Sequence, residues 1–392
     1  MPDAISLDAI HGRILLGPGP SNCHPSVLRA LAAPLVGHLD PQFIEIMNEI
    51  QDLLREVFRT GNRLTIPVSG TGSAGMETVF VNLLEPGDTA LVCVNGVFGT
   101  RMSDIVERCG GKLIRVDAPW GRPVDIEAVR KALADAKVKL LAVVHAETST
   151  GVLQPLEELS RIAHDAGALF LVDTVTSLGG CDVRVDDWKI DACYSGTQKC
   201  LSCPPGLSPV TFSEQALAAI QKRKNKVQSW YLDMNMVMKY WGPERTYHHT
   251  APVSMNYALR QALLLIVEEG LEKRFHRHLL NHRALVAGLQ AMGLSMLVEK
   301  PYRLPTLNTV LVPEGVDEAA VRKRLLQAFD IEIGSGLGDL KGKTWRIGLM
   351  GFSSSRNNVL LVLAALAEAL GVQGRRTDAA SALAAANAVY ES

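Results

Sequence analysis

The sequence predicts an α/β fold: a large domain with a mostly parallel sheet covered by helices, followed by a smaller C-terminal α+β domain. From about residue 64 to 212, short apolar and β-branched segments alternate with amphipathic helical segments. Strands that are apolar throughout are typical of a parallel sheet buried on both faces. Beyond about residue 253 the pattern becomes helical and charged, and then short strand-like segments return.

The composition is that of a globular protein with an ordinary core. Of the 392 residues, 47% are hydrophobic and 21% are charged, so extensive disorder is not expected. The balance of 40 Lys and Arg against 41 Asp and Glu argues against a nucleic-acid partner. The most apolar segment, 359–370, is too short to span a membrane, and the first 15 residues lack the features of a signal peptide. Seven cysteines without framework spacing indicate reduced thiols, so we expect a cytoplasmic protein.

A strand over 64–68 begins the predicted sheet and runs into a glycine-rich turn at 69–75, which opens a helix over about 75–84. The glycines that match G-x-G-x-x-G are Gly70, Gly72 and Gly75. Bare backbone amides at such a helix start can hold a phosphate. A dinucleotide site would also need a carboxylate after the next strand, over 89–94, and none is present there. We therefore favour an anion site over a nicotinamide site, with a purely structural turn as the alternative.

Two buried strands, over 140–145 and 168–172, predict the middle of the sheet, with a helix over 154–167 between them. Pro155 suits the first helical position, and Gly167 can end the helix in a left-handed conformation. Ligands of open α/β sheets bind beyond the carboxyl ends of the strands. The residues that follow these strands are therefore the candidate functional residues.

Asp173 follows the second of these strands, and Lys199 follows the next apolar strand, so both should reach the same edge of the sheet. A lysine in a desolvated cleft can lose its proton and form a Schiff base. A carboxylate beneath a pyridine nitrogen keeps that nitrogen protonated. Taken singly, a solvated lysine and a helix-capping aspartate are simpler interpretations. Together with the phosphate turn, the two residues predict a pocket for pyridoxal phosphate.

The C-terminal part is predicted to contain strands at 306–312, 331–334 and 344–349, with helices at 317–329 and 357–370. The alanine-rich tail is compatible with either a peripheral helix or a frayed end. The expected organisation is an N-terminal arm (1–20), a large cofactor-binding domain (21–268), a small domain (269–372) and the tail (373–392).

Two further patterns are better explained by a structural role than by metal binding or redox chemistry. His278 and His282 are four residues apart but lack the Glu of an H-E-x-x-H motif, so we expect a solvated helix and no metal site. Cys200 and Cys203 form C-x-x-C outside a thioredoxin-like context, so we expect them to pack in the core.

The chain resembles the alanine–glyoxylate and serine–pyruvate aminotransferases, which are class V pyridoxal-phosphate enzymes with the aspartate aminotransferase-like fold (fold type I). The resemblance runs from about residue 15 to 370, and several motifs in one order are more specific than any one of them. The matching stretches are LLGPGPSN (15–22), SGTGSAGME (69–77), HAETSTGVLQPL (145–156), LFLVDTVTSLGG (169–180), YSGTQKCLSCPPG (194–206), WYLDM (230–234), YWGPERTYHHTAPV (240–253), RLPTLNTV (303–310) and TWRIGLMG (344–351).

The resemblance implies a role for each matching position around the cofactor. Lys199 would form the Schiff base, and Asp173 would pair with the pyridinium nitrogen. Residues implied to contact the phosphate or its surroundings are Thr71, Gly72, Ser73 and Gln198, together with Tyr247 and Thr250, which would reach the phosphate of the neighbouring subunit.

The resemblance also implies three departures and a substrate site. Phe98 takes the place of a Trp that stacks on the cofactor ring in close relatives, and it still offers a π face. Thr148 stands where relatives have Ser, and Ser73 stands where some have His. Arg346 would clamp the α-carboxylate of the substrate with its guanidinium fork, and Gly19 would approach the substrate through its backbone.

The activity implied is transfer of the amino group of alanine, serine or both to glyoxylate, giving glycine and a 2-oxo acid, by a homodimer with shared active sites. An alternative is a ureidoglycine–glyoxylate aminotransferase, which uses amide side chains near the substrate. Asn256 lies near the relevant bend, but His38 stands where a Gln is expected. A third possibility is a pyridoxal lyase such as a cysteine desulfurase, but the stretch 334–342 lacks the nucleophilic Cys that a desulfurase needs.

Overall fold

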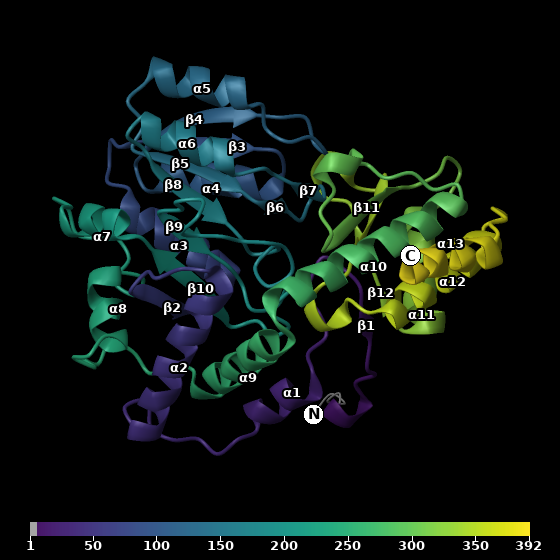
Figure 1. The fold of residues 1–392 in the computed structure, drawn as a ribbon, viewed down its shortest axis with the longest axis horizontal. Helices are drawn as coiled ribbons and strands as arrows, with labels where there is room; N and C mark the ends of the chain where they lie inside the picture. The colour runs from purple at the N-terminus through teal and green to yellow at the C-terminus, as the bar shows by residue number, and fades with distance from the viewer. Residues whose placement is uncertain (1–5) are drawn as a thin grey trace, which may run out of the picture.

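The computed structural model describes residues 6–392 and contains the mostly parallel sheet that the sequence predicts (Figure 1). In pairing order, its seven strands are β2 (Leu64–Ser69), β10 (Leu207–Phe212), β9 (Ala192–Tyr194), β8 (Leu169–Asp173), β5 (Leu140–Val144), β3 (Thr89–Val94) and β4 (Lys112–Asp117). Strand β10 runs antiparallel to both of its neighbours, and the other pairs are parallel. The carboxyl ends of β8 and β9 therefore lie side by side.

Alternate residues of each central strand enter two different apolar layers. On β5, Leu140 and Val144 belong to one layer, whereas Leu141 and Val143 belong to the other. This burial on both faces explains why the strand is apolar throughout. Helices of the first layer include α3 (Gly72–Leu83), α4 (Val97–Arg108), α7 (Glu214–Gln221) and α8 (Met234–Trp241). Those of the second include α1 (Pro25–Leu31), α5 (Ile126–Asp135), α6 (Glu157–Asp165) and α9 (Val253–Glu269), and α2 (Pro41–Phe58) contributes to both.

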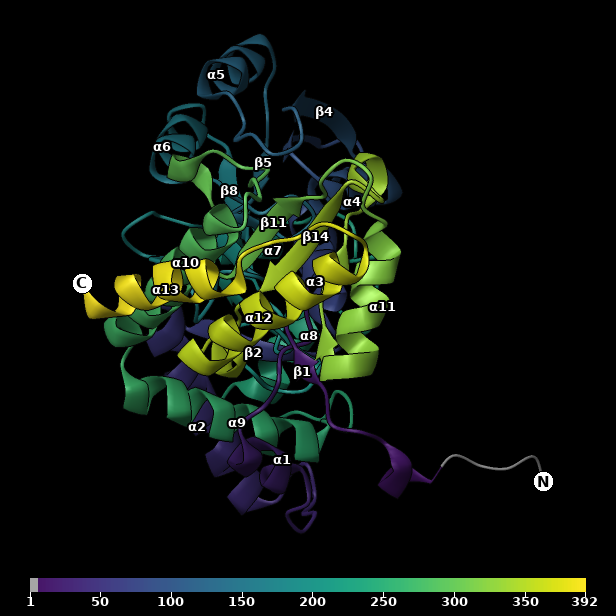
Figure 2. The same ribbon diagram turned by 90° about the vertical axis from the view of Figure 1, so that its right-hand side faces the viewer.

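In the C-terminal part of the chain, helices lie beside a small sheet (Figure 2), and their apolar side chains form a core of their own. Its antiparallel sheet has the order β11 (Leu307–Leu311), β14 (Thr344–Gly348) and β13 (Gly334–Ser335), and the helices are α10 (Leu271–Ala291), α11 (Glu318–Phe329) and α12 (Arg356–Val372). The N-terminal strand β1 (Ile14–Leu15) pairs in parallel with β12 (Ile331–Glu332). The start of the chain is thereby attached to the C-terminal core. The predicted domain boundary after residue 268 lies at the end of α9 and remains a prediction.

The alanine-rich tail forms a packed helix, α13 (Ala379–Glu391), which the sequence left undecided. Ala382 and Ala386 are fully buried in the same core as α10 and α12. The Tyr390 hydroxyl donates a hydrogen bond to Asn281 Oδ1 (2.7 Å). Small side chains let α13 approach α10 closely, so alanine here reflects packing. Among the helices of residues 6–392, none combines the length and apolar character that a bilayer-spanning helix requires.

The predicted start of the helix after β5 is wrong by three residues. Helix α6 begins at Glu157, and Pro155 lies before it. The reason is that Gln154 belongs to a different structure: its backbone N–H donates to His145 O (2.8 Å), and its Oε1 accepts from Val124 N–H (2.7 Å). The predicted left-handed end of the helix is confirmed, because Gly167 has a φ of 73°.

The prediction of a solvated helix around His278 and His282 is also wrong, because both side chains are buried. His278 Nδ1 lies 2.7 Å from Arg274 O, and its Nε2 accepts from Gly351 N–H (2.9 Å). His282 Nδ1 lies 2.7 Å from Asn308 Oδ1. Both imidazoles therefore serve the packing of α10. Within residues 6–392 there is no group of three or more His, Cys, Asp or Glu side chains that could hold a metal ion.

Candidate active site

The carboxylate of Asp173 is fixed at the carboxyl end of β8. It is 2% exposed, and its register partner on β9 is Tyr194. The Tyr194 hydroxyl donates to Asp173 Oδ2 (2.6 Å), and Val175 N–H donates to Oδ1 (2.8 Å). Burial raises the pKa of Asp173 to about 6, although the bond from Tyr194 acts in the opposite direction. Tyr194 begins the matching stretch at 194–206, but no sequence pattern assigned it a role, because that role depends on lying opposite Asp173 in the sheet.

Lys199 lies in the loop after β9 and is 8% exposed. Its amine donates to Pro18 O, and a Cβ on Gly19 would lie 2.6 Å from Lys199 Cδ. Gly19 has a φ of 108°, which favours glycine, and without a Cβ the N-terminal segment can approach the lysine this closely. Burial, and after it the positive charge of Arg346, lowers the pKa of Lys199 to about 8. The predicted pair of lysine and carboxylate is thus brought to one edge of the sheet, with the two groups in electrostatic contact.

The glycine-rich turn provides a helix start with free amides, as predicted, but α3 begins at Gly72, three residues before the predicted start. Thr71 is the N-cap of α3, and its side chain makes no capping hydrogen bond. Gln198 lies beside this turn: a Cβ on Gly196 would lie 2.8 Å from Gln198 Oε1 and 3.4 Å from Gly72 Cα. Within the described residues, Gln198 Oε1 is buried without a hydrogen-bond partner. A buried amide of this kind points to a polar group supplied from outside the chain.

Phe98 and Ser73 are linked by a residue that the sequence did not mark. The guanidinium of Arg101 lies over the Phe98 ring, 4.9 Å from its centroid, and Arg101 also donates to Ser73 Oγ (3.1 Å). Ser73 is in the first turn of α3, so the Phe98 ring lies close to the glycine-rich turn.

Arg346 reaches the large domain from strand β14 of the small sheet. Its Nε donates to Ser335 O (2.6 Å), and one terminal nitrogen donates to Thr148 O (3.1 Å). Thr148 follows the short strand β6 (Ala146–Glu147), which pairs with β7 (Val152–Leu153). The Thr148 hydroxyl is 2.5 Å from that of Thr176. Arg346 is 6% exposed, and burial lowers its pKa only to about 10, so it remains a cation beside Lys199.

The side chains of Tyr247 and Thr250 are not bonded to the candidate site residues described above. Both are exposed, Tyr247 by 60%, and within residues 6–392 neither side chain makes a hydrogen bond. The segment that carries them is nevertheless anchored near the glycine-rich turn, because His249 Nε2 lies 2.8 Å from Ser69 Oγ. A role for these two residues at a neighbouring subunit stays a prediction.

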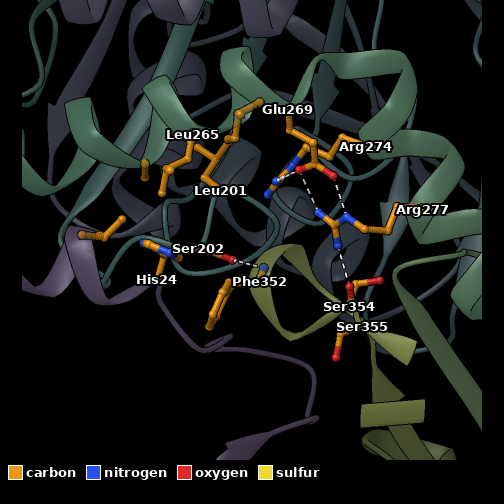
Figure 3. A pocket seen from close by; sticks show the side chains of 13 residues that line it. His24, Leu201, Ser202, Leu265, Glu269, Arg274, Arg277, Phe352, Ser354 and Ser355 are labelled. Atoms are coloured by element: carbon orange, nitrogen blue, oxygen red, sulfur yellow. Dashed lines mark hydrogen bonds and ion pairs between the residues drawn. The ribbon is translucent and has the colours of Figure 1, made fainter. Parts of the chain in front are cut away.

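A cavity of about 330 Å³ lies beside the loop that follows β9, between α9 and α10 (Figure 3). Glu269 accepts hydrogen bonds from Arg274 (2.6 Å) and Arg277 (2.5 Å) at its polar side. Although burial opposes it, the two arginines hold the pKa of Glu269 at about 2. Arg274 also donates to Cys200 O (2.7 Å), and Arg277 donates to Ser354 O (2.5 Å). These charged side chains therefore hold the loop after β9, which carries Lys199, against the small domain.

Comparison with known proteins agrees with this geometry. Residues 26–349 match the family model described as aminotransferase class-V. The solved alanine–glyoxylate aminotransferase from Nostoc sp. is 51% identical, with a TM-score of 0.92 and coverage of 94% of this chain and 97% of that one. The ureidoglycine–glyoxylate aminotransferase from Bacillus subtilis is 42% identical, with a TM-score of 0.96 and coverage of 98% and 99%. The alanine–glyoxylate aminotransferase of Callithrix jacchus is 43% identical over 92% of this chain and 88% of its own length. With this family match over residues 26–349 and relatives of this identity and coverage, the chain belongs to the class-V aminotransferases.

Proposed function

We propose that the protein is a pyridoxal-phosphate-dependent aminotransferase that moves the amino group of alanine, serine or both to glyoxylate, giving glycine and a 2-oxo acid. The observation that carries this proposal is the buried Lys199 amine, flanked by the Asp173 carboxylate and the Arg346 guanidinium. The names of the similar proteins from Nostoc sp. and Callithrix jacchus support glyoxylate as the amino acceptor.

The residues present fit pyridoxal phosphate. The free amides at the start of α3 suit the phosphate, and the Asp173 carboxylate suits a protonated ring nitrogen. When bound, the cofactor supplies an aldehyde that takes up the amino group and a ring that withdraws electrons from the donor Cα. The Tyr194 hydroxyl holds Asp173 in one orientation, so the carboxylate does not have to reorganise.

Residues of the chain can act as the base, bind the carboxylate of the donor and exclude water from the site. With its pKa lowered to about 8, the Lys199 amine can be a neutral base at moderately alkaline pH and can carry the proton taken from the donor Cα. Arg346 can bind the donor α-carboxylate bidentately with the N–H groups that Ser335 and Thr148 leave free. Gly19 closes the site against Lys199, which keeps water away from the amine.

The pH dependence of cofactor capture follows from the environment of Lys199. Only the neutral amine attacks an aldehyde, and a free lysine has a pKa of about 10.4. With the pKa lowered to about 8, the rate of pyridoxal phosphate capture by the unloaded protein should rise as the pH increases through about 8 and then level off. Arg346→Gln removes a charge that lowers this pKa, so its midpoint should lie at higher pH. Stopped-flow absorbance measures the midpoint, and Arg376→Gln, on the surface, is the control. A midpoint that stays in place in Arg346→Gln would contradict the electrostatic coupling.

A second candidate function is transfer from ureidoglycine to glyoxylate. It is favoured by the likeness to the Bacillus subtilis enzyme of that name, and by Asn256, whose buried Oδ1 has no hydrogen-bond partner within the described residues. The decisive experiment measures glycine formation from glyoxylate with alanine, serine or ureidoglycine as the donor. Turnover with alanine or serine supports the main proposal, and turnover with ureidoglycine alone supports the alternative. Pyruvate release without glycine formation would indicate a lyase.

We also propose that the active unit is a homodimer with shared sites. An aromatic patch of partly exposed rings supports this: Trp230 is 60% exposed and stacks on His248 (4.5 Å), and Tyr231 is 41% exposed. Tyr247 extends the patch toward His38, with ring centroids 5.3 Å apart. Contiguous exposed rings are typical of surfaces that another protein covers.

Two inactive variants should complement each other if Tyr247 and Thr250 serve the partner's phosphate. A Lys199→Ala subunit retains both residues, and a Tyr247→Ala/Thr250→Val subunit retains the lysine. In a random mixture of dimers, about one site in four then has every group. Co-expression with two affinity tags, followed by assay of the purified heterodimer, tests this. Activity no higher than that of the separate variants would show that the two residues do not act across an interface.

A further inference from the structure

Helix α4, which carries Phe98, begins without a capping side chain of its own. Its N-cap residue is Gly96. The first amides of the helix are bonded by another segment of the chain: Val97 N–H donates to Ser149 Oγ (3.0 Å), and Phe98 N–H donates to Glu147 Oε2 (3.2 Å). The β6–β7 hairpin therefore supplies the cap that the helix lacks.

Glu147 is fully buried, and its hydrogen bonds within the described residues come from donors. Its Oε1 accepts from Ser149 N–H (3.0 Å) and from the Ser149 hydroxyl (2.6 Å). Since Ser149 Oγ already accepts from Val97, its proton is available to Glu147. Burial raises the pKa of Glu147, and these bonds oppose that change. A side chain at the positive end of a helix that is surrounded by hydrogen-bond donors alone is suited to be an ionised carboxylate.

The contact between Glu147 and the helix start is close enough to require glycine. Gly96 has an extended backbone, with a φ of 172°, that any residue could adopt. A Cβ at this position, however, would meet Ser149 Oγ and lie 2.5 Å from Glu147 Cδ. The carboxylate is thus packed directly against the first turn of α4.

The same short segment also holds the candidate substrate clamp. Thr148, the residue after Glu147, accepts a hydrogen bond from Arg346 through its carbonyl (3.1 Å). Thr150 Oγ1 donates to Asn95 O (3.4 Å), just before α4. Residues 147–150 therefore set the position of the Phe98 helix relative to Arg346.

We propose that the Glu147 carboxylate is a positioning residue of the active site, which holds the Phe98 ring against the bound cofactor by capping α4 from outside the helix. This inference rests on the proposed use of pyridoxal phosphate. It adds a residue that contacts neither substrate nor cofactor and acts through the backbone of Phe98.

The charge of Glu147 gives the proposal a second readout. The groups that raise the pKa of Lys199 are Cys200, Asp173 and Glu147, and Arg346 lowers it. Removing the negative charge of Glu147 should therefore lower this pKa further. The pH midpoint of pyridoxal phosphate capture should then fall below about 8, opposite to the change expected for Arg346→Gln.

The test is Glu147→Gln in the unloaded protein, with pyridoxal phosphate as the probe. The amide keeps the shape but turns an NH₂ group toward backbone and hydroxyl donors. We expect about 10-fold weaker cofactor binding, the size typical of a lost hydrogen bond to a charged group. Hydrogen exchange should be faster at the amides of Val97 and Phe98, and the capture midpoint should move to lower pH.

Two further variants separate position from charge. Glu147→Asp keeps the charge but is too short to reach Phe98, so binding should weaken without a change in midpoint. Ser149→Ala removes the bond from Val97 N–H and the hydroxyl bond to Glu147, but it leaves the carboxylate on Phe98 N–H, so its loss of affinity should be smaller. Glu107→Gln, exposed at the far end of α4, is the matched control and should bind as the wild type does.

Folded Glu147→Gln with wild-type affinity, or with an unchanged midpoint, would overturn the proposal. If Glu147→Gln does not fold, wild-type affinity in both Glu147→Asp and Ser149→Ala overturns it instead. These measurements do not depend on the amino donor or acceptor. A wild-type protein that does not bind pyridoxal phosphate would instead overturn the proposed function, so the two failures are distinguishable.

Discussion

Replacing Lys199 by Ala should lower the turnover number by about 10⁴-fold, the upper range for the loss of a positioned acid–base group. The side chain is buried at the edge of the sheet, and its pKa is lowered to about 8, so it can be neutral when it takes a proton. Steady-state glycine formation from glyoxylate measures the loss. The visible absorption band of the lysine-bound cofactor should also be absent from the variant.

Lys199→Arg separates charge from proton transfer. An arginine keeps the cation but does not release its proton in a protein, so it should be as inactive as alanine. Lys226→Ala, which changes an exposed lysine, should retain wild-type turnover. Ordinary turnover in Lys199→Ala or Lys199→Arg would refute the assignment of this residue.

Replacing Asp173 by Asn should lower the turnover number by about 10²- to 10³-fold, as is typical when a preorganised electrostatic contact is lost. Asn can keep both neighbours, because its carbonyl can accept from Val175 N–H and its NH₂ can donate to the Tyr194 oxygen. The fold should therefore survive while the negative charge beneath the ring nitrogen is lost. Single-turnover kinetics with the donor would locate the effect in the chemical step.

Tyr194→Phe tests the support of this carboxylate. It removes the hydroxyl that donates to Asp173 Oδ2 but leaves the charge, so the effect on turnover should be smaller than that of Asp173→Asn. Asp135→Asn, at the exposed end of α5, makes the same chemical change away from the site and should have no effect. Near wild-type turnover in Asp173→Asn would contradict the proposed role of the carboxylate.

The central sheet and the candidate site residues could be predicted because each is associated with a short-range sequence pattern. Strands buried on both faces are apolar throughout, as β5 is, and the residues that follow such strands are at the ligand edge. Asp173 and Lys199 were identified in this way, and the structure brings them together. The glycine-rich turn also has a recognisable sequence pattern, because a strand that turns directly into a helix needs small residues.

Some local patterns were misleading because a tertiary contact outweighed them. Pro155 has the chemistry of a helix start, but Gln154 is bonded to His145, just after β5, and to Val124, so α6 begins later. The charged segment around His278 suggests a solvated face. The inner side of this helix, with His278, is buried because Arg274 and Arg277 bond to Glu269 and to backbone carbonyls inside the protein.

Sequence alone thus determined the class of fold, the edge of the sheet that carries the candidate site, and the lysine and carboxylate on which the proposed chemistry rests. Only the tertiary structure decided which groups support them. Tyr194 acts on Asp173 through strand register, and Glu147 caps α4 from a separate hairpin. The physical reason is that burial and backbone conformation are recorded in short-range patterns. A hydrogen bond between segments distant in the chain depends on how those segments pack, and no local pattern records it.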